Sequence, residues 1–387
     1  MNRTFHSVRL DKQRCTGCTH CMRECPTEAI RVRKGKASII NERCIDCGEC
    51  IRVCPYHAKR AVTDPFMIKD AFEYTIALPS PEFYGQFEDL SRIEPLLEGL
   101  KDLGFDAVYE VAYGADIVSA LVKQEMDKNP NKPLICSVCP VIVRLIQTRF
   151  PGLIDHIVPV DPPAEVAAIM AKRDFARKRG IKPSQVGAFF ITPCSAKITN
   201  VRNPIGREKS AINGVFSILE IYGMLSKRQR NPDAVYEDGP RGTRHGVGWS
   251  IIGGVNSAID CKNAVSVDGI RNVLAVLEEL EDGNLSDVDF FEGWACDGGC
   301  VGGPLNFANG YVAQTRIRKL MESMDDAPLD CERLLLDLED YDPHRDIPIL
   351  EQVNKLDDDF TQALLKMERI DKITASLPGL DCGSCGS

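Results

Sequence analysis

The chain has 387 residues, of which 47 are Lys or Arg and 56 are Asp or Glu, so its formal net charge is −9. Single hydrophobic cores stop growing at about 250 to 300 residues, and this length therefore predicts more than one domain. The acidic balance argues against nucleic acid and against an anionic membrane surface as partners.

Membrane insertion and secretion are not expected either. No apolar run approaches the roughly 18 residues of a transmembrane helix, and the first residues lack the apolar segment of a signal peptide. We therefore expect a cytoplasmic protein, in which clustered thiols usually bind metal instead of forming disulfides. Seventeen cysteines are present, and iron is the first candidate for the bound metal.

Two copies of the motif C-x2-C-x2-C-x3-C-P occupy residues 15–26 and 44–55. This is the spacing of bacterial two-cluster ferredoxins, in which each [4Fe-4S] cluster takes three cysteines from one copy and the last cysteine of the other. The sequence therefore predicts a small α+β ferredoxin-like domain over residues 1–65. Its expected ligands are Cys15, Cys18, Cys21 and Cys54 for cluster one, and Cys44, Cys47, Cys50 and Cys25 for cluster two.

A zinc module is the alternative interpretation of these repeats. Zinc modules usually pair C-x2-C units across a spacer, and a third cysteine at the same step does not serve a tetrahedral ion. The spacing therefore favours iron–sulfur clusters. A domain of this kind moves electrons and carries out no bond chemistry alone.

From residue 66 onward, short apolar runs alternate with amphipathic helical patterns, which predicts α/β layers with parallel strands. In such folds ligands lie beyond the carboxyl ends of the strands. The acidic stretch 325–359 is expected to be a solvated helical surface. Strands are expected at 73–78, 106–112, 133–138, 155–160, 186–191 and 288–294, and helices at 93–103, 163–180, 217–230 and 270–280.

Three cysteine blocks come just after, or within, these predicted strands. They read Cys136-Ser-Val-Cys139-Pro, Thr192-Pro-Cys194-Ser-Ala-Lys197 and Trp294-Ala-Cys296-Asp-Gly-Gly-Cys300. Downstream of the ferredoxin motif, the three blocks together resemble the signature blocks of [FeFe]-hydrogenases. The resemblance extends from about residue 8 to residue 320 and implies a two-lobed α/β hydrogenase domain, placed at residues 66–375.

The resemblance also implies the family's cofactor, the H-cluster, and its reaction, the reversible cleavage of H2 into two protons and two electrons. Lys197 would hydrogen-bond a cyanide ligand, and the segment of Pro79 and Ser80 would donate to the other cyanide. In this family the cofactor contains a diiron unit with a dithiolate ligand that carries an amine. Hydrogen would be cleaved between a Lewis-acidic iron and that amine. The four ligands would be Cys139, Cys194, Cys296 and Cys300, which hold a [4Fe-4S] cube, and Cys300 would bridge it to a diiron unit with CO, CN and azadithiolate.

Several residues depart from the family pattern. Val138 stands where catalytic members have a proton-relay cysteine, and a valine side chain can neither donate nor accept a proton. The acidic relay positions upstream fall at Val122 and Glu125, so only Glu125 is retained, and a relay serine falls at Val158. Thr192 and Trp294 stand in place of methionines, and Ala164 stands in place of a glutamine near the cluster.

Loss of a general acid–base relay typically costs about 10²- to 10⁴-fold in rate, so turnover should fall much more than hydrogen binding. We therefore expect a slow, sensory [FeFe]-hydrogenase that works with a redox protein or a signalling partner (a kinase, phosphatase or regulator) and depends on maturation proteins. Cys382 and Cys385, within residues 376–387, resemble the opening of an additional cysteine motif of sensory members; the alternative is a tail.

Two other functions remain open. One is a catabolic, ferredoxin-linked [FeFe]-hydrogenase with high turnover. The other is a hydrogenase-like iron–sulfur assembly factor, which keeps the cubes but lacks the diiron unit. Lys197 and the paired glycines after Cys300 favour the full H-cluster over the assembly factor.

Overall fold

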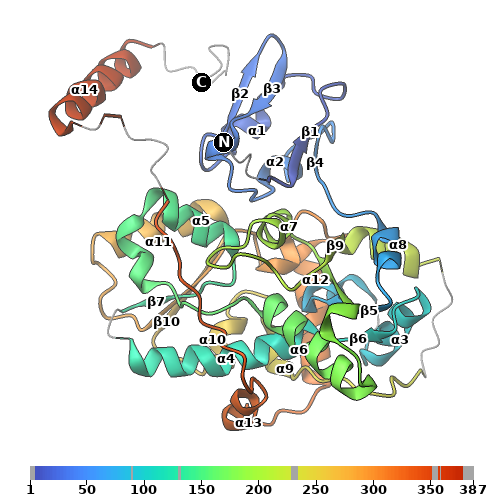
Figure 1. Cartoon of the computed structure of the whole chain (residues 1–387). Helices are drawn as coiled ribbons and strands as arrows, with labels where there is room; N and C mark the ends of the chain where they lie inside the picture. Colours follow the sequence, from blue (N-terminus) through green and yellow to red (C-terminus); the bar gives the residue numbers. More distant parts are fainter. Residues whose placement is uncertain are drawn as a thin grey trace.

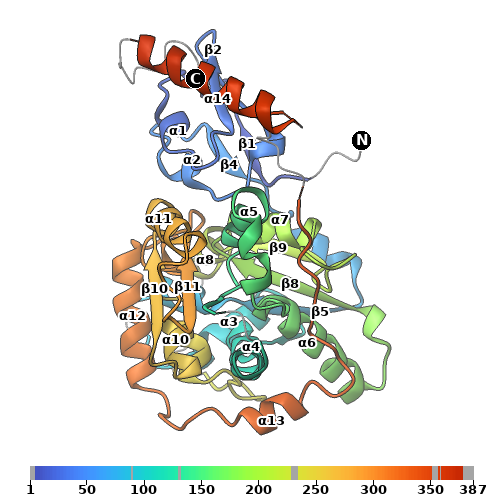
Figure 2. The same cartoon turned by 90° about the vertical axis from the view of Figure 1, so that its left-hand side faces the viewer.

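The computed structural model describes residues 5–88, 90–129, 132–227, 234–350, 356–357 and 359–377. Figures 1 and 2 show a small N-terminal body that lies on one end of a larger α/β body. Within the larger body, two separate parallel sheets form two lobes, and helices cover their faces.

The small body consists of two antiparallel two-stranded sheets and two one-turn helices that follow the cysteine loops. Gly17 and Gly48 turn these loops with φ angles of +74° and +81°. A Cβ at Gly17 would lie 2.7 Å from the backbone of Gly35, so only glycine fits there. The elements are β1 (Val8–Leu10) paired with β4 (Lys59–Ala61), β2 (Ile30–Arg33) paired with β3 (Lys36–Ile39), α1 (His20–Arg23), η1 (Asn41–Arg43) and α2 (Glu49–Arg52).

The first lobe is a four-stranded parallel sheet in the order β6-β5-β8-β9. Every residue of its central strand β8 is buried, as expected for a parallel strand covered on both faces. The strands are β5 (Tyr74–Pro79), β6 (Ala107–Val108), β8 (Val186–Thr192) and β9 (Gly214–Ser217), and the elements around them are η2 (Phe66–Ala71), η3 (Pro81–Gln86), α3 (Glu94–Asp102), α6 (Pro163–Arg179), η5 (Pro183–Gln185) and α8 (Ile218–Leu225).

The second lobe is a three-stranded parallel sheet in the order β10-β11-β7. Its strands are β7 (Leu134–Ile135), β10 (Ala264–Asp268) and β11 (Phe290–Trp294). The remaining elements of the chain are α4 (Val111–Lys128), α5 (Pro140–Arg149), η4 (Pro151–His156), α7 (Ser195–Arg202), α9 (Arg244–Gly248), α10 (Gly254–Ile259), α11 (Ile270–Glu281), η6 (Cys300–Gly302), α12 (Gly310–Glu322), α13 (Cys331–Leu336) and α14 (Phe360–Ser376).

The carboxyl ends of four strands carry the sequence blocks that were expected to form the site. β5 is followed by Ser80, β8 by Cys194, β7 by Cys136 and Cys139, and β11 by Cys296. Since ligands of α/β folds bind beyond the carboxyl ends of strands, this edge is where a site shared between the lobes is built.

Several predicted elements differ in the structure. Only two residues of the predicted strand 106–112 are extended, because α4 begins at Val111. This helix is buried along most of its length between the lobes, so its apolar residues do not follow one face and it was not recognised as a helix. Strand 133–138 shrinks to β7, and 155–160 contributes only a bridge from Ile157 to Ile135 and a second from Val160 to His344. β9 and β10 were missed.

The described residues of the acidic stretch 325–359 are mostly irregular and are helical at α13, contrary to the expected helical surface. The following helix α14 buries none of its residues, and Figures 1 and 2 show it apart from the α/β body. Cys382 and Cys385 lie outside the described residues. No helix in the described part of the chain combines the length and the apolar character needed to span a membrane.

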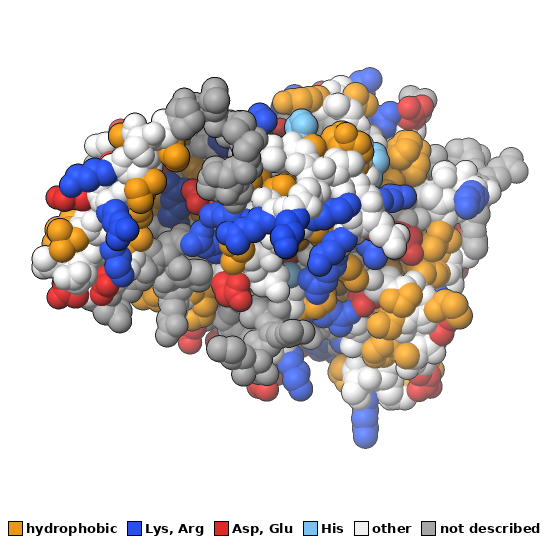
Figure 3. Space-filling view, turned by 90° about the horizontal axis from the view of Figure 1, so that it is seen from above, with side chains coloured by type: hydrophobic (Ala, Val, Ile, Leu, Met, Phe, Trp, Pro, Cys, Tyr) orange, Lys and Arg blue, Asp and Glu red, His pale blue; other side chains and the backbone are white. Residues whose placement is uncertain are grey.

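The small body is basic although the whole chain is acidic. Residues 5–65 contain 12 Lys and Arg against 7 Asp and Glu. Seen from above, Lys and Arg side chains gather in a band across this end of the molecule (Figure 3). The net charge of the chain therefore does not describe the surface around the predicted ferredoxin clusters.

Candidate functional site

Twelve cysteines are arranged as three groups of four, and each group borders its own cavity. Including the open space at their mouths, the three cavities have similar volumes of about 290, 340 and 350 Å³. Each group joins residues that are distant in the chain. Cys15, Cys18, Cys21 and Cys54 border the first cavity, Cys25, Cys44, Cys47 and Cys50 the second, and Cys139, Cys194, Cys296 and Cys300 the third, which lies between the lobes.

The local surroundings of these sulfurs suit metal-bound thiolates. Backbone N–H groups donate to them, as Ala37 N does to Cys15 Sγ at 3.3 Å and Lys197 N does to Cys194 Sγ at 3.4 Å. Burial raises the pKa of Cys44 to about 12 and that of Cys194 to about 11. Buried thiols of this kind stay neutral and unreactive until a bound cation displaces their protons.

The second and third cavities are neighbours because Cys47 borders both of them. The loop around Cys47 contacts the start of α7 directly: Ser195 Oγ donates to Asp46 O at 2.7 Å. A Cβ at Gly48 would lie 2.6 Å from Pro304 Cγ and 2.8 Å from Ser195 Oγ. The absence of a side chain at Gly48 therefore lets the small body pack closely against the segments that carry the cysteines between the lobes.

Lys197 joins the third group of cysteines to a buried carboxylate. Its Nζ lies 3.5 Å from Cys300 Sγ and 3.2 Å from Glu82 Oε1. Burial would lower the pKa of Lys197, but Cys300 and Glu82 raise it well above its usual value. Burial would raise the pKa of Glu82, but Lys197 and the Ser80 hydroxyl lower it. The pair is therefore an ammonium and a carboxylate, and the ammonium faces the sulfur of Cys300.

Glu82 was not identified from the sequence. It lies in η3, directly after the Leu-Pro-Ser-Pro segment that ends β5, and it is 2% exposed. An acidic residue inside an otherwise apolar run at the carboxyl end of a strand is the signal that could have found it.

A fourth, larger cavity adjoins the third one and shares Lys197, Pro140 and Trp294 with it; its volume is about 710 Å³ including the open space at its mouth. Its wall also contains aliphatic residues and prolines, together with the acidic residues Glu82 and Glu165. Five residues that the sequence singled out line this cavity, namely Ser80, Val138, Ala164, Lys197 and Trp294.

The remaining predicted residues do not line it. Pro79 and Thr192 end β5 and β8, and the Thr192 hydroxyl is buried without a hydrogen-bond partner in the described part of the chain. Glu125 lies near the end of α4, where His344 Nε2 is 3.4 Å from its carboxylate, away from the cavity. The structure therefore does not bring Glu125 to Val138.

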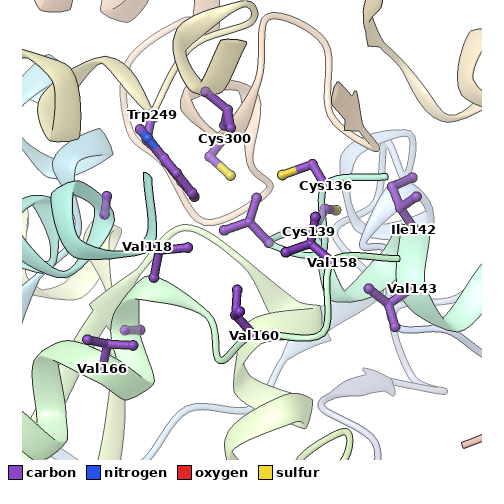
Figure 4. Packing of buried hydrophobic residues seen from close by; sticks show 14 of the residues in the cluster. Val118, Cys136, Cys139, Ile142, Val143, Val158, Val160, Val166, Trp249 and Cys300 are labelled. Carbon is purple, nitrogen blue, oxygen red and sulfur yellow. The ribbon is translucent and has the colours of Figure 1, made fainter. Parts of the chain in front are cut away.

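Val158, which stands at the family's relay-serine position, lies in a cluster of buried apolar side chains. Figure 4 shows Val118, Val158 and Val160 on one side of Cys136, Cys139 and Cys300. All three valines are at most 3% exposed. No proton can be passed along these side chains, since none has a donor or an acceptor.

The donor set fits the cofactors that the cysteine blocks imply. Four thiols around each of three cavities match the four ligands of a [4Fe-4S] cluster. Beside the third group, the larger cavity offers an ammonium and the Ser80 hydroxyl to an anionic group bonded to Cys300. Glycines allow close approach there, because a Cβ at Gly303 would lie 2.8 Å from Pro193 O.

Two family models match the chain. Residues 73–264 and 255–304 match the model of the iron only hydrogenase large subunit, C-terminal domain. Together these residues make up more than half of the chain. Residues 7–55 match the 4Fe-4S dicluster domain. Both spans contain the cysteine groups described above.

Curated relatives cover the chain to different extents. The periplasmic [Fe] hydrogenase large subunit of Nitratidesulfovibrio vulgaris is 26% identical over 363 residues, 77% of this chain and 86% of that protein. Iron hydrogenase 1 of Clostridium pasteurianum is 23% identical over 252 residues, 53% of this chain, and the match spans only 44% of that longer protein. The cytosolic Fe-S cluster assembly factor NAR1 of Yarrowia lipolytica is 31% identical over 98 residues, 25% of this chain and 20% of that protein.

Among solved structures, a variant of the [FeFe]-hydrogenase HydA1 from Chlamydomonas reinhardtii matches with a TM-score of 0.55 at 19% identity and covers 71% of this chain and 94% of that one. This likeness confirms the predicted α/β fold of the larger body, and the dicluster match confirms the ferredoxin-like fold of the small one. The chain belongs to the family of iron-only hydrogenase large subunits and carries a 4Fe-4S dicluster domain ahead of the hydrogenase domain.

Proposed function

We propose that this protein is an [FeFe]-hydrogenase that binds H2 and cleaves it reversibly at an H-cluster held by Cys139, Cys194, Cys296 and Cys300. One observation carries the proposal: Lys197 lies between Cys300 Sγ and Glu82, at the wall shared by the four-cysteine cavity and the larger cavity. A [4Fe-4S] cluster alone needs only the four-cysteine cavity between the lobes. The larger cavity and the ammonium give a diiron unit a place beside Cys300.

When bound, the diiron unit supplies the Lewis acid and the amine base that divide H2. The side chains of this chain do the rest. The Lys197 ammonium and the Ser80 hydroxyl would donate to anionic ligands of that unit, and the apolar wall limits the access of water. Electrons would leave past Cys47, which borders both neighbouring cavities, toward the two clusters of the small body.

Val138 makes slow turnover part of the proposal. This side chain lines the larger cavity in place of the relay cysteine and is 8% exposed. Because an aliphatic side chain at the reacting centre passes no protons, H2 binding is retained while turnover falls, and this behaviour suits a sensor. The proposed partners are a redox protein or a signalling protein, and maturation proteins would load the diiron unit.

The test of slow turnover is the substitution Val138→Cys in fully matured protein. A thiol at this position restores a proton carrier, so the H2 oxidation rate should rise at least about 10-fold. Val143→Cys is the matched control, because Val143 is buried on the neighbouring helix α5 but does not line the cavity. Wild-type turnover that is already high, with no gain from Val138→Cys, would favour a catabolic enzyme.

The assembly-factor function keeps one supporting observation, the 98-residue match to NAR1. A protein with that function would carry cubane clusters only. Carbonyl and cyanide infrared bands after maturation therefore separate the two functions, since an assembly factor should show none.

A further inference from the structure

Two acidic residues line the larger cavity, Glu82 and Glu165, and the surroundings of their carboxylates differ. Glu82 is paired with Lys197. Glu165 has no such ammonium partner within ion-pair distance in the described part of the chain. It lies in the first turn of α6, directly after Ala164, and it is 7% exposed.

The carboxylate of Glu165 is hydrogen-bonded to two residues that do not line the cavity. Ser210 Oγ donates to Glu165 Oε2, and Ala211 N donates to Glu165 Oε1. Ser210 is half-exposed, and its Oγ accepts from Ile212 N at 3.1 Å, which leaves a second lone pair for water. One carboxyl group and one hydroxyl therefore connect the cavity wall to the surface.

We propose that Glu165 is the proton relay of this cavity and that it exchanges protons with solvent through Ser210. The inference rests on the proposed hydrogenase function. It follows from position: Val138 provides no carrier, Val122 and Val158 at two other relay positions are apolar, and Glu125 does not line the cavity. Glu165 lines the cavity and also bonds to a hydroxyl at the surface.

In H2 oxidation, a proton released in the cavity forms an O–H bond on the Glu165 carboxylate. The acid then gives that proton to Ser210 Oγ while the Ser210 hydroxyl proton passes to water, so carboxylate and hydroxyl are both regenerated. The two electrons leave separately through the iron–sulfur clusters. Hydrogen evolution follows the same steps in reverse.

The surroundings of Glu165 shift its pKa in both directions. Burial raises its pKa, the hydrogen bonds from Ser210 and Ala211 lower it, Asp161 raises it and Arg207 lowers it; the net direction is upward. Burial lowers the pKa of Lys172 on the same helix, against the attraction of Glu165. Carboxyl groups that share a site and have their pKa values pushed apart take separate roles, so Glu82 stays anionic while Glu165 exchanges a proton. The other groups that sense the charge of Glu165 are Arg345, which lines the cavity, and Tyr341.

The test is Glu165→Gln in fully matured protein. The amide keeps the size of the side chain and can still bond to Ser210 and Ala211, but it carries no exchangeable acid proton. We expect kcat for H2 oxidation to fall at least about 10-fold, while the KM for H2 stays within about twofold. Glu208→Gln is the matched control, because Glu208 is exposed on the same loop as Ser210. A Glu165→Gln rate within about twofold of wild type would overturn the proposal.

A second measurement uses protein that carries only the [4Fe-4S] clusters. The infrared carbonyl stretch of a protonated carboxyl group should titrate in wild type, and one such band should be missing in Glu165→Gln and present in Glu208→Gln. If Glu165→Gln does not fold, Ser210→Ala tests the same path and should slow turnover with the KM unchanged. An unchanged band or an unaffected Ser210→Ala rate counts against the relay. Wild-type protein without H2 binding would instead refute the hydrogenase function.

Discussion

At the scale of single residues, the buried pair of Lys197 and Glu82 is the most consequential contact of the site. Both side chains are withdrawn from water, and Lys197 Nζ approaches Cys300 Sγ as well. A buried pair adds little net stability, but removing one partner leaves the other charge buried and uncompensated. The pair therefore fixes the position of the ammonium, and the stability of the fold depends on both residues.

Lys197→Met should destabilise the hydrogenase domain by about 3 kcal/mol, because Glu82 is left as an unpaired buried carboxylate. The double variant Lys197→Met/Glu82→Gln should regain most of that loss. Thermal unfolding under anaerobic conditions measures both. Lys178→Met is the control, since its pair with Asp238 is exposed and worth at most about 1 kcal/mol. Equal effects of Lys197→Met and Lys178→Met would contradict the role given to the pair.

The cysteine ligands could be predicted from the sequence and Glu82 could not, for a physical reason. Ligand spacing is a local property, since three cysteines at steps of three residues wrap one corner of a cluster. The partnership of Glu82 and Lys197 joins residues 115 positions apart and depends on how η3 packs against α7. Val138 could also be placed at the site from local sequence, because it lies between Cys136 and Cys139. The position of Glu125 could not, because it depends on how the far end of α4 packs.

At the scale of elements, the carboxyl ends of β5 and β8 in one sheet, and of β7 and β11 in the other, gather the residues of the site. Two buried acids lie at the start of the helix α4 between the lobes: Glu110, which directly precedes the helix, and Asp116 within it. Glu110 accepts hydrogen bonds from Tyr84 OH at 3.1 Å and from Arg241 N at 2.6 Å, and Asp116 accepts from Thr243 N at 2.8 Å. These acids hold the loop that leads into α9.

Burial raises the pKa of Glu110 to about 7 and that of Asp116 to about 6. A raised acid pKa favours folding below the unfolded pKa, and that stability is lost as the pH rises through the folded pKa. Stability should therefore fall between about pH 4.5 and 7, with about 3 kcal/mol linked to Glu110. Glu110→Gln should flatten this dependence in thermal unfolding, while exposed Glu322→Gln should not. An unchanged slope in Glu110→Gln would show that Glu110 does not titrate in this range.

Long amphipathic helices could be predicted from their periodicity, and the strands β5, β8 and β11 could be predicted from short continuous apolar runs, because these strands are buried on both faces. α4 could not, since a helix packed on most of its sides has no polar face. The two-residue strands β6 and β7 were overextended, because apolar runs continue past them into α4 and α5.

At the scale of the whole molecule, the small basic body rests on the α/β body at the point where Cys47 meets the cysteines between the lobes. The domain that matches the dicluster model therefore contacts the domain that matches the hydrogenase model, and the contact lies where their cysteine groups meet. The contact depends on the absence of a side chain at Gly48, because a Cβ there would collide with Pro304 and Ser195.

Gly48→Ala should separate the two bodies and weaken the magnetic coupling between cluster two and the cluster between the lobes, as measured by electron paramagnetic resonance on reduced protein. Gly35→Ala is a matched control: its φ is +70°, similar to the +81° of Gly48, but nothing lies within 4 Å of its Cβ position. Both variants bear the backbone strain of a positive φ, and only the first meets another body. Equal coupling in the two variants would mean that this contact does not set the cluster separation.

The association of the two bodies could be expected from the order of the motifs, but its geometry could not, because nothing local marks Gly48 as a point of contact. The central claim, a diiron unit attached through Cys300, is tested most directly by infrared spectroscopy of matured protein under H2. We predict carbonyl and cyanide bands that shift when H2 is added. Matured protein that contains cubane iron and shows no such bands would contradict the claim.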